Sequence, residues 1–405
     1  MTNVVDINQI VITGIGAVTS IGTNAQAFGE GLKQGAVGVG IVHDLDCEGR
    51  LKPERAFRVR DFSPPKYAKI LDPFIQYILA ATEEALADSA LDLSRIDSNR
   101  IGIAVSSSKG GMMTFEKFFE RFKKRPSAIL GARIYANFIP NIAAQWVARH
   151  WKITGPAKPV SAACATGLFS LLEGIRMIED GEIDYCIAGA GDASVTRLVT
   201  AGYRNMGVLS SGCMRPFDKR RDGFLIGEGA GIVIFERESS ARARGAKIYG
   251  HVKRYAYGFE SSHPYAFSCD GDGLSSCLKK LIRDANIYPR EIDYLNLHGT
   301  ATSQGDRYET AQIKSAFGSE ANKIAMSSTK SLVGHMIGAS GAVEVIACLI
   351  AMRDSFVPPT ANLEEPDPEC DLDYTPLVAK EKKVNLSCSI SIGFGGHLGA
   401  ILIEK

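Results

Sequence analysis

Short apolar runs alternate along this chain with longer segments in which apolar residues recur at helical spacing. The runs predict buried strands, and the segments predict amphipathic helices. The predicted strands cover residues 10–15, 101–105, 159–163, 184–189, 232–236, 292–297, 324–328, 384–392 and 400–403. The predicted helices cover residues 72–88, 142–151, 167–179, 274–285, 307–317 and 338–353. Such alternation favours an α/β fold in which helices cover a mixed sheet on both faces.

The two halves of the sequence carry similar units. Ile-Asp-Tyr opens an apolar run at residues 183–185 and again at 292–294, and each half contains a strand, a loop with reactive side chains and a helix. With 405 residues, the chain is long enough for two or three domains of about 150 residues. We therefore expect two similar halves, residues 1–250 and 251–405.

Composition narrows the class of protein. The 46 Lys and Arg residues nearly balance the 45 Asp and Glu residues, so no overall charge attracts the chain to nucleic acid or to anionic lipid. No uncharged apolar stretch approaches the ~20 residues of a membrane helix, and residues 1–10 lack the features of a secretory signal. The nine cysteines include no C-x-x-C pair, which indicates free thiols rather than a zinc site. We expect a cytoplasmic protein that binds neither nucleic acid nor membrane.

Cys164 is the first candidate for chemistry. It follows an apolar run and lies among Ala163, Ala165 and Gly167, where a helix is expected to begin. The partial positive charge at a helix N-terminus favours the thiolate, which is the nucleophilic form of cysteine. Small neighbours let a substrate carbonyl approach. The alternative is an inert buried thiol, as most cysteines are.

Two histidines and a lysine follow in the second half. His298 ends a predicted strand in Leu-His-Gly-Thr-Ala-Thr, and Lys330 and His335 lie five residues apart across a strand-to-helix turn. The next predicted helix is rich in small residues and carries Glu344. Taken singly, each histidine is more simply a structural imidazole, and Lys330 is more simply a solvated cation.

A glycine-rich stretch near the C-terminus, Ile-Gly-Phe-Gly-Gly-His-Leu-Gly at residues 392–399, exposes backbone N–H groups. Such groups form oxyanion sites, although a plain β-turn has the same composition. The chain has no G-x-x-x-x-G-K-[ST] phosphate loop, no complete dinucleotide motif and no G-x-S-x-G elbow. A cysteine, two histidines, a lysine and a glycine-rich loop are together the groups needed to acylate a thiol and to stabilise an enolate.

These groups, in this order, resemble the elongating, type II β-ketoacyl-acyl carrier protein synthases of the thiolase-fold superfamily. The resemblance runs from Val-Ile-Thr-Gly at residues 11–14 to the glycine-rich loop. It includes Arg-Pro-Phe-Asp (215–218), Arg-Asp-Gly-Phe (221–224) and Gly-Glu-Gly-Ala-Gly (227–231). It implies a thiolase-like α/β fold with two similar halves in a five-layer αβαβα arrangement.

The resemblance also implies a role for each candidate. Cys164 would be the acylated nucleophile, and His298 and His335 would polarise the malonyl thioester carbonyl during decarboxylation. Lys330 would balance charge near His335, supported by a buried Glu344. The further site residues that the resemblance implies are Gly393, Phe394, Gly395 and Phe224 for the oxyanion hole and gate, and Thr300, Thr302, Lys109 and Ile392 for substrate binding.

The implied reaction is a decarboxylative Claisen condensation in fatty acid elongation. An acyl group held on Cys164 would react with malonyl-acyl carrier protein to give 3-oxoacyl-acyl carrier protein, in ping-pong order. No metal and no cofactor are implied, because the substrates arrive on the phosphopantetheine of the carrier protein. A carrier protein is acidic, so basic residues should surround the entrance. The implied carrier-protein contacts are Lys66, Lys69, Arg133 and Arg204. A homodimer is implied by the resemblance alone.

Four positions depart from the family pattern: Lys109, Ile392, His397 and Leu398. An apolar residue normally lines the acyl pocket where Lys109 stands, and an unpaired ammonium there is costly. Lys109 should therefore shorten the pocket, recruit a polar chain or point to the dimer surface, and we expect a shifted acyl preference. His397 is either a third imidazole near the site or a histidine of a surface loop.

Three alternatives to fatty acid elongation are considered. A thiolase would share Gly334-His335 but needs a second catalytic cysteine where this chain has Gly393-Phe394-Gly395. An inactive chain-length partner of a synthase heterodimer would lack Cys164. The third alternative is a ketosynthase of a specialised lipid, aryl polyene or polyketide pathway, which keeps the chemistry and changes the acyl preference.

Overall fold

The computed structural model describes residues 6–43, 45, 54–125, 134–261 and 271–405. Its main feature is a nine-stranded sheet with the order β4-β5-β6-β1-β7-β13-β12-β8-β9. The strands are β1 (Ile10–Val18), β4 (Ile101–Ser106), β5 (Tyr185–Ala193), β6 (Glu228–Arg237), β7 (Gly250–Phe259), β8 (Tyr294–Asn296), β9 (Ala325–Ser327), β12 (Leu386–Gly393) and β13 (His397–Glu404). Two small sheets pair β2 (Gly40–Val42) with β3 (Glu54–Ala56) and β10 (Phe356–Val357) with β11 (Lys380–Glu381).

The sheet consists of two runs of strands that meet at one short junction. The strands from the first part of the chain, β4, β5, β6 and β1, form one run, and β7, β13, β12, β8 and β9 form the other. The runs are joined where β1 pairs with β7 through only Val11–His251 and Ile12–Gly250. In each run the outer pairs, β4–β5, β12–β8 and β8–β9, are parallel, while the inner pairs are antiparallel.

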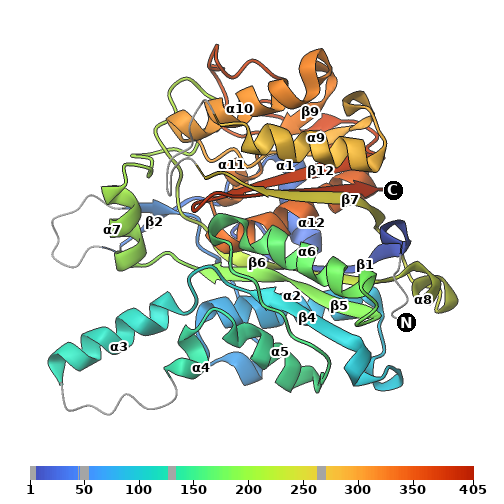
Figure 1. The fold of residues 1–405 in the computed structure, drawn as a ribbon. Helices are drawn as coiled ribbons and strands as arrows, with labels where there is room; N and C mark the ends of the chain where they lie inside the picture. The colour runs from blue at the N-terminus through green and yellow to red at the C-terminus, as the bar shows by residue number, and fades with distance from the viewer. Residues whose placement is uncertain (1–5, 44, 46–53, 126–133, 262–270) are drawn as a thin grey trace.

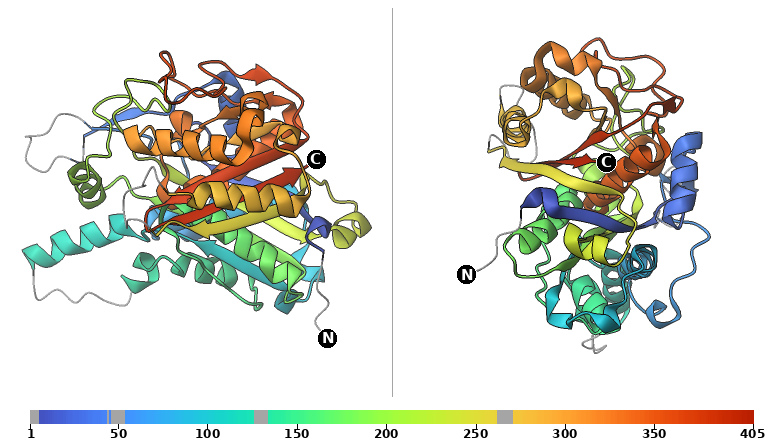
Figure 2. Two further views of the ribbon diagram at one scale, coloured as in Figure 1. Left: turned by 45° about the horizontal axis from the view of Figure 1, so that its top comes forward. Right: turned by 90° about the vertical axis from the view of Figure 1, so that its right-hand side faces the viewer.

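Helices form three layers around these two runs (Figures 1 and 2). On the outside of the first run, α2 packs on β1, β5 and β6. Between the runs, α6 packs on β4 and β5, and its neighbour α12 packs on both β6 and β12. On the far side, α9 covers β7 and β13 with α10 beside it. These contacts give the αβαβα order expected from the sequence. The helices are α1 (Ala25–Gln34), α2 (Pro73–Ser89), α3 (Met112–Lys124), α4 (Tyr135–Phe138), α5 (Ile142–Trp151), α6 (Thr166–Glu179), α7 (Arg197–Asn205), α8 (Glu238–Ala243), α9 (Gly273–Ala285), α10 (Ser303–Phe317), α11 (Lys330–Val333) and α12 (Ser340–Asp354).

The central layer is possible because α12 carries small or apolar residues around most of its circumference. All its residues from Ser340 to Met352 are buried, as expected for a helix in the middle of a domain. Glycines bring α6 and α12 close together at their N-termini. A Cβ on Gly341 would lie 2.7 Å from the backbone nitrogen of Leu168, and one on Gly167 would lie 2.6 Å from that of Ala342. The N-termini of both central helices therefore approach the same region.

The structure corrects the sequence-based elements in a few places. The strand predicted at residues 159–163 is wrong: residues 159–162 have no regular structure, Ala163 begins a 3-10 turn, and only the preceding Ala157 bridges to Ile103. The other predicted strands and helices overlap elements of the fold. The elements that the sequence does not predict are α1, α3, α4, α7, α8, α11, β2, β3, β7, β10 and β11. No helix in the described residues combines the length and the apolar character needed to cross a bilayer.

Candidate active site

Cys164 lies at the N-terminus of α6, in a short 3-10 turn, Ala163–Ala165. Ala163 adopts φ +48°, a left-handed conformation that costs an alanine roughly 1–2 kcal/mol and bends the chain sharply before the helix. The thiol is buried, with 3% of the residue exposed. Burial raises the pKa of the Cys164 thiol to about 11, although Lys109, Lys330 and a hydrogen bond from the Phe394 backbone oppose the shift. The expected thiolate is therefore not the resting form, because burial outweighs the nearby positive charges.

A cavity of about 350 Å³ opens in front of this thiol. Cys164, His298 and His335, which are distant in the sequence, line the same cavity. The other lining residues are Met206, Gly207, Val208, Phe224, Thr300, Thr302, Ser303, Gln304, Gly305, Glu309, Ile392 and Phe394. The predicted convergence of one sulfur and two imidazoles on a small pocket is thus present in the structure.

The two imidazoles are held next to each other and uncharged. Their ring centroids are 5.6 Å apart with the planes at 90°. Burial and the charge of Lys330 lower the pKa of both rings well below 6.5. The Lys330 Nζ atom lies 3.4 Å from Nδ1 of His298, and Ser340 Oγ lies 3.1 Å from Nδ1 of His335. An ammonium can only donate, so Nδ1 of His298 is the acceptor and its proton is on Nε2.

Lys330 is itself fully buried, on α11, and forms an ion pair with Glu344 on α12. Among the described residues, none forms a hydrogen bond with the second carboxylate oxygen of Glu344. Burial raises the pKa of Glu344, and Lys330 opposes that shift. The pair is therefore a compensated buried charge, and removing either partner leaves the other charge without compensation.

We expect Lys330→Met to lower the free energy of unfolding by about 3–5 kcal/mol, because Glu344 is then left buried without its counterion. The double variant Lys330→Met/Glu344→Gln should regain most of this loss. Chemical denaturation of the two variants measures the difference. Since Lys330 also donates to His298, the double variant should recover stability without recovering enzymatic activity. Equal stability of the single and double variants would contradict this account.

Glu309, on α10, is a site residue that the sequence reading missed. Its carboxylate accepts the backbone N–H groups of His298 and Gly299, at 2.7 and 2.8 Å, and so fixes the turn that presents the imidazole. Burial raises the pKa of Glu309 to about 7 despite these two hydrogen bonds. No local pattern could have revealed this residue, because its role depends on the packing of α10 against the end of β8.

The glycine-rich stretch forms the hairpin between β12 and β13. Gly395 and Gly396 adopt φ +83° and +87°, which favour glycine, and a Cβ on Gly393 would lie 2.6 Å from the backbone oxygen of Ala162. The hairpin can therefore approach the Cys164 turn closely. The Phe394 side chain is half-buried and lines the cavity.

Phe224 closes the cavity on its other side. Its ring lies edge-on to His335, with centroids 4.9 Å apart, and edge-on to Tyr203 of α7, with centroids 5.3 Å apart. Phe224 follows the Arg-Asp-Gly segment that holds Arg221. The contacting rings of Phe224 and Tyr203 thus form the side of the site next to His335.

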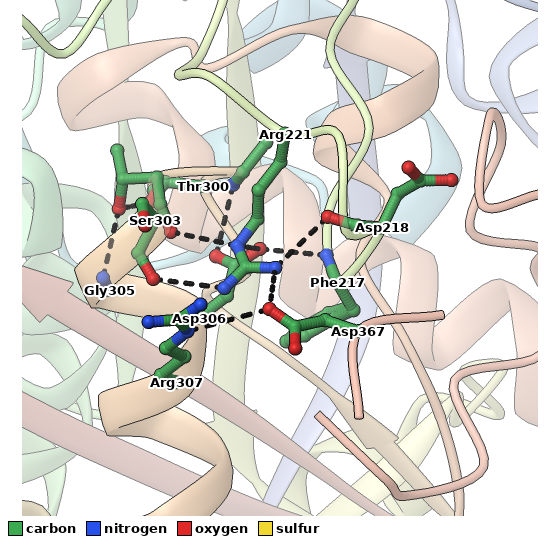
Figure 3. Close-up of polar contacts among 12 residues, drawn as sticks. Phe217, Asp218, Arg221, Thr300, Ser303, Gly305, Asp306, Arg307 and Asp367 are labelled. Carbon is green, nitrogen blue, oxygen red and sulfur yellow. Dashed lines mark hydrogen bonds and ion pairs between the residues drawn. The ribbon is translucent and has the colours of Figure 1, made fainter. Parts of the chain in front are cut away.

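Arg221 fixes the loop between β8 and α10 (Figure 3). Its guanidinium donates to the backbone oxygens of Thr302 and Ser303 and to the carboxylate of Asp367, at 3.2, 2.9 and 2.7 Å. Asp306, next to it, accepts the backbone N–H of Ala301. This buried network holds the loop that carries Thr300 and Thr302 toward the cavity. The sequence reading noted Arg221 only as part of a motif.

The remaining predicted residues lie in different places. Ile392 lines the cavity, whereas His397 does not and instead packs between the rings of Phe169 and Phe259. Lys109 is half-buried behind Phe224, against the ring of Tyr203. The predicted carrier-protein contacts are Lys66 and Lys69, which are exposed, Arg204, which pairs with Glu54, and Arg133, which lies outside the described residues. Leu398 is fully buried in the hydrophobic core formed by α9, α10, β12 and β13.

The chemistry available to this cavity follows from its groups. A thiol can accept an acyl group, and two neutral imidazoles can stabilise negative charge on an oxygen between them. Among the described residues, no His, Cys, Asp and Glu side chains are grouped so as to hold a metal ion. The fold and the cavity define an acyl-transferring thiol enzyme with two histidines.

Comparisons with known proteins identify the family. The model of the β-ketoacyl synthase N-terminal domain matches residues 8–241, and that of the C-terminal domain matches residues 249–364. The chain is 36% identical over 409 residues to the 3-oxoacyl-[acyl-carrier-protein] synthase 2 of Staphylococcus aureus (strain COL), covering 98% of both chains. It is 35% identical to the synthase 2 of Coxiella burnetii, again over 98% of both chains. The chain belongs to the β-ketoacyl synthase family.

Solved structures agree with this assignment. The ketosynthase AntDE, solved with its type II PKS acyl-carrier protein AntF, superimposes with a TM-score of 0.91 at 30% identity, over 98% of this chain and 99% of that one. The ishigamide ketosynthase/chain length factor gives 0.91 at 31% identity, over 99% and 100%. A β-ketoacyl synthase from Burkholderia phymatum gives 0.90 at 28% identity, over 98% and 99%. Family membership and the absence of a cysteine from Gly393–Gly395 decide against a thiolase.

Proposed function

We propose that this protein is a 3-oxoacyl-acyl carrier protein synthase that elongates fatty acyl chains by decarboxylative condensation with malonyl-acyl carrier protein. The observation that carries the proposal is the single cavity lined by Cys164, His298 and His335. The two synthases named above, 35–36% identical over nearly the whole chain, support the substrate class. The presence of Cys164 in the cavity argues against an inactive chain-length partner.

The first half-reaction loads Cys164. Its sulfur forms a thioester with the acyl carbonyl carbon, the bond from that carbon to the phosphopantetheine sulfur breaks, and the thiol proton of Cys164 passes to the leaving sulfur. The backbone N–H groups of Cys164 and Phe394 form the oxyanion hole for the tetrahedral intermediate. The hydrogen bond from the Phe394 backbone to the thiol supports this role, because it brings that N–H to the reacting atom.

The second half-reaction uses the two histidines. Malonyl thioester loses CO₂, and the charge that develops on its thioester oxygen is stabilised by the Nε2–H groups of His298 and His335. The resulting carbanion attacks the acyl carbonyl on Cys164, which breaks the thioester, releases 3-oxoacyl-carrier protein and leaves the Cys164 thiolate, which takes up a proton from solvent to restore the thiol. Neutral imidazoles suit this task, because each ring can donate its N–H as a hydrogen bond to the oxygen without transferring the proton.

Substrate contacts follow from the loop that Arg221 fixes. Thr300 and Thr302 bind the pantetheine arm through their hydroxyl groups, which are 3.2 Å apart at the cavity. Phe224 and the Phe394 side chain gate the cavity and limit water, which would quench the carbanion. No metal or organic cofactor takes part, since the substrates bring the phosphopantetheine.

An acidic carrier protein delivers the substrates. Lys66 and Lys69 are exposed before α2, and a second, larger depression beside α3 is lined by Lys117, Arg121 and Lys124 together with Glu116 and Glu120. Basic residues on neighbouring elements support electrostatic docking. Binding of acyl carrier protein that persists unchanged in 0.5 M salt, where such attraction is screened, would contradict this surface.

A second copy of the chain covers an apolar face. α3 has no buried residue, and Phe119, Phe122, Tyr135 and Leu198 are each at least 40% exposed on α3, α4 and α7. These helices project on one side of the molecule (Figure 1). We propose a homodimer, which light scattering in solution tests directly. The seven described cysteines are all free, which supports a reducing compartment and a cytoplasmic location.

A specialised pathway is the second candidate function. It keeps the chemistry and changes the acyl group, as in an aryl polyene or polyketide ketosynthase. The observation that favours it is Lys109 against Tyr203, close to the nucleophile. The ketosynthases AntDE and ishigamide ketosynthase, at 30–31% identity, are consistent with it.

The proposed function is tested by mixing the enzyme with malonyl-acyl carrier protein and a series of acyl-acyl carrier proteins. We expect a covalent acyl adduct on Cys164 and, after malonyl addition, a 3-oxoacyl product two carbons longer with release of CO₂. Intact-mass spectrometry measures the adduct and the product. Saturated acyl chains as best donors support elongation, and strong rejection of them favours the specialised pathway. An enzyme that forms neither adduct nor product contradicts both.

A further inference from the structure

Lys109 occupies an unusual position for a cation. It comes three residues after β4, which packs against α6, the helix that begins at the nucleophile. Its side chain turns inward: the residue is half-buried, and its Nζ atom lies 5.5 Å from the centre of the Tyr203 ring. The sequence leaves open whether Lys109 shortens the pocket, recruits a polar chain or points to the dimer surface. The contact with Tyr203 does not direct the ammonium away from the molecule.

The ammonium of Lys109 has no acceptor. Among the described residues, none accepts a hydrogen bond from it or forms an ion pair with it. The charge of Lys109 also acts on the buried Asp192, whose carboxylate already accepts hydrogen bonds from Ser107, Ser194 and the backbone of Ser108 and Gly338. A half-buried cation without a partner is costly, and an anion that enters the pocket would remove that cost.

Lys109 lies next to the acyl site, although it does not line the cavity. Cys164, Tyr203 and Phe224 belong to one buried cluster, and the Tyr203 ring lies between Phe224 and the Lys109 ammonium. The charge of Lys109 acts on both Cys164 and His335, which places it near the reacting atoms. A chain attached to Cys164 reaches Lys109 only by displacing Phe224 and running along Tyr203, because neither Tyr203 nor Lys109 lines the cavity.

We infer that Lys109 and Tyr203 form a subsite for an acyl chain that carries a carboxylate at its far end. This inference rests on the proposed function and names the substrate class of the same site. The carboxylate pairs with the Lys109 ammonium, and the methylene groups pack against the ring of Tyr203. A plain alkyl chain of equal length leaves the ammonium unpaired and desolvated, so it loads more slowly.

The test measures loading of Cys164 from matched acyl-pantetheine thioesters, which need no carrier-protein docking. Hexanoyl and adipoyl donors differ only at the far end, octanoyl and suberoyl donors repeat the comparison at greater length, and 6-hydroxyhexanoyl is the neutral polar control. Intact-mass spectrometry under single-turnover conditions gives the loading rates. The variants are Lys109→Met, Lys109→Arg and, as a remote control on α9, Lys279→Met.

We expect the carboxylate-to-alkyl rate ratio of the wild type to fall at least about tenfold in Lys109→Met, as the loss of one charge-assisted hydrogen bond implies. Lys109→Arg and Lys279→Met should keep the ratio. An unchanged ratio in Lys109→Met, or an equal fall for both donors, would overturn the inference while leaving the proposed function intact. Faster loading of 6-hydroxyhexanoyl than of adipoyl would also overturn it. No adduct on Cys164 from any donor would overturn the proposed function and the inference together.

Discussion

Cys164→Ala abolishes condensation but leaves the release of CO₂ from malonyl-acyl carrier protein. The acyl group has no other attachment point in the cavity, because Cys164 is its only cysteine among the described residues. Removing a covalent nucleophile should lower the rate of 3-oxoacyl formation by at least about 10⁴-fold. Decarboxylation needs only the two imidazoles and the pantetheine contacts, none of which the substitution touches. Product analysis and CO₂ release are measured on the same samples.

The matched control is Cys213→Ala. Cys213 is also free and is half-buried, but it does not line the cavity. Its replacement should leave both rates near those of the wild type. Two results would speak against the assignment: an acyl adduct on a cysteine other than 164, or 3-oxoacyl product from Cys164→Ala above the uncatalysed background.

The fold could be predicted from the sequence wherever the apolar residues of a segment form a clear helical or strand pattern. Residues 142–151 were predicted as a helix with the bounds that α5 has, and the fully buried α12 was found from its small apolar residues. The strand predicted at residues 159–163 failed, because an apolar run before an active-site turn has the same composition as a strand. In the structure, Ala163 with φ +48° ends this segment, and its backbone does not join the sheet.

The candidate site could be predicted as far as its reactive side chains, since cysteine, histidine and lysine stand out in short motifs. The residues that hold them could not. Glu309 acts through the backbone of His298, a contact that depends on the position of α10, and Ser340 contacts the His335 ring from the start of α12. The sequence also favours a thiolate at Cys164, because it indicates the helix N-terminus, but it does not show the burial that raises the pKa of the thiol. Tyr203, which locates the Lys109 ammonium, gave no sequence signal at all.

His298→Ala and His335→Ala reverse the behaviour of Cys164→Ala. In the proposed mechanism each imidazole supplies one N–H donor to the charge that forms on the malonyl thioester oxygen, and losing one such donor costs about 10²–10³-fold in rate. Both variants should therefore lose decarboxylation and condensation together. Loading of Cys164 from an acyl donor should persist, because neither ring belongs to the oxyanion hole that we propose for the backbone of Cys164 and Phe394. Adduct mass and CO₂ release measure the two steps separately.

The protonation state of the rings provides a second test of the same mechanism. Because burial and Lys330 lower the pKa of His298 and His335 well below 6.5, both rings should remain neutral as the pH falls from 8 to 6. His251→Ala is the control variant. His251 is half-buried beside Glu238 and does not line the cavity, so its replacement should leave both catalytic steps unchanged. Nitrogen-15 NMR of labelled histidines reports charge and tautomer at each ring, with single-histidine variants giving the assignment. A ring at position 298 or 335 that gains a proton between pH 8 and 6 would contradict the lowered pKa, and a ring that is an imidazolium at the pH of the assay would rule out the neutral two-donor mechanism.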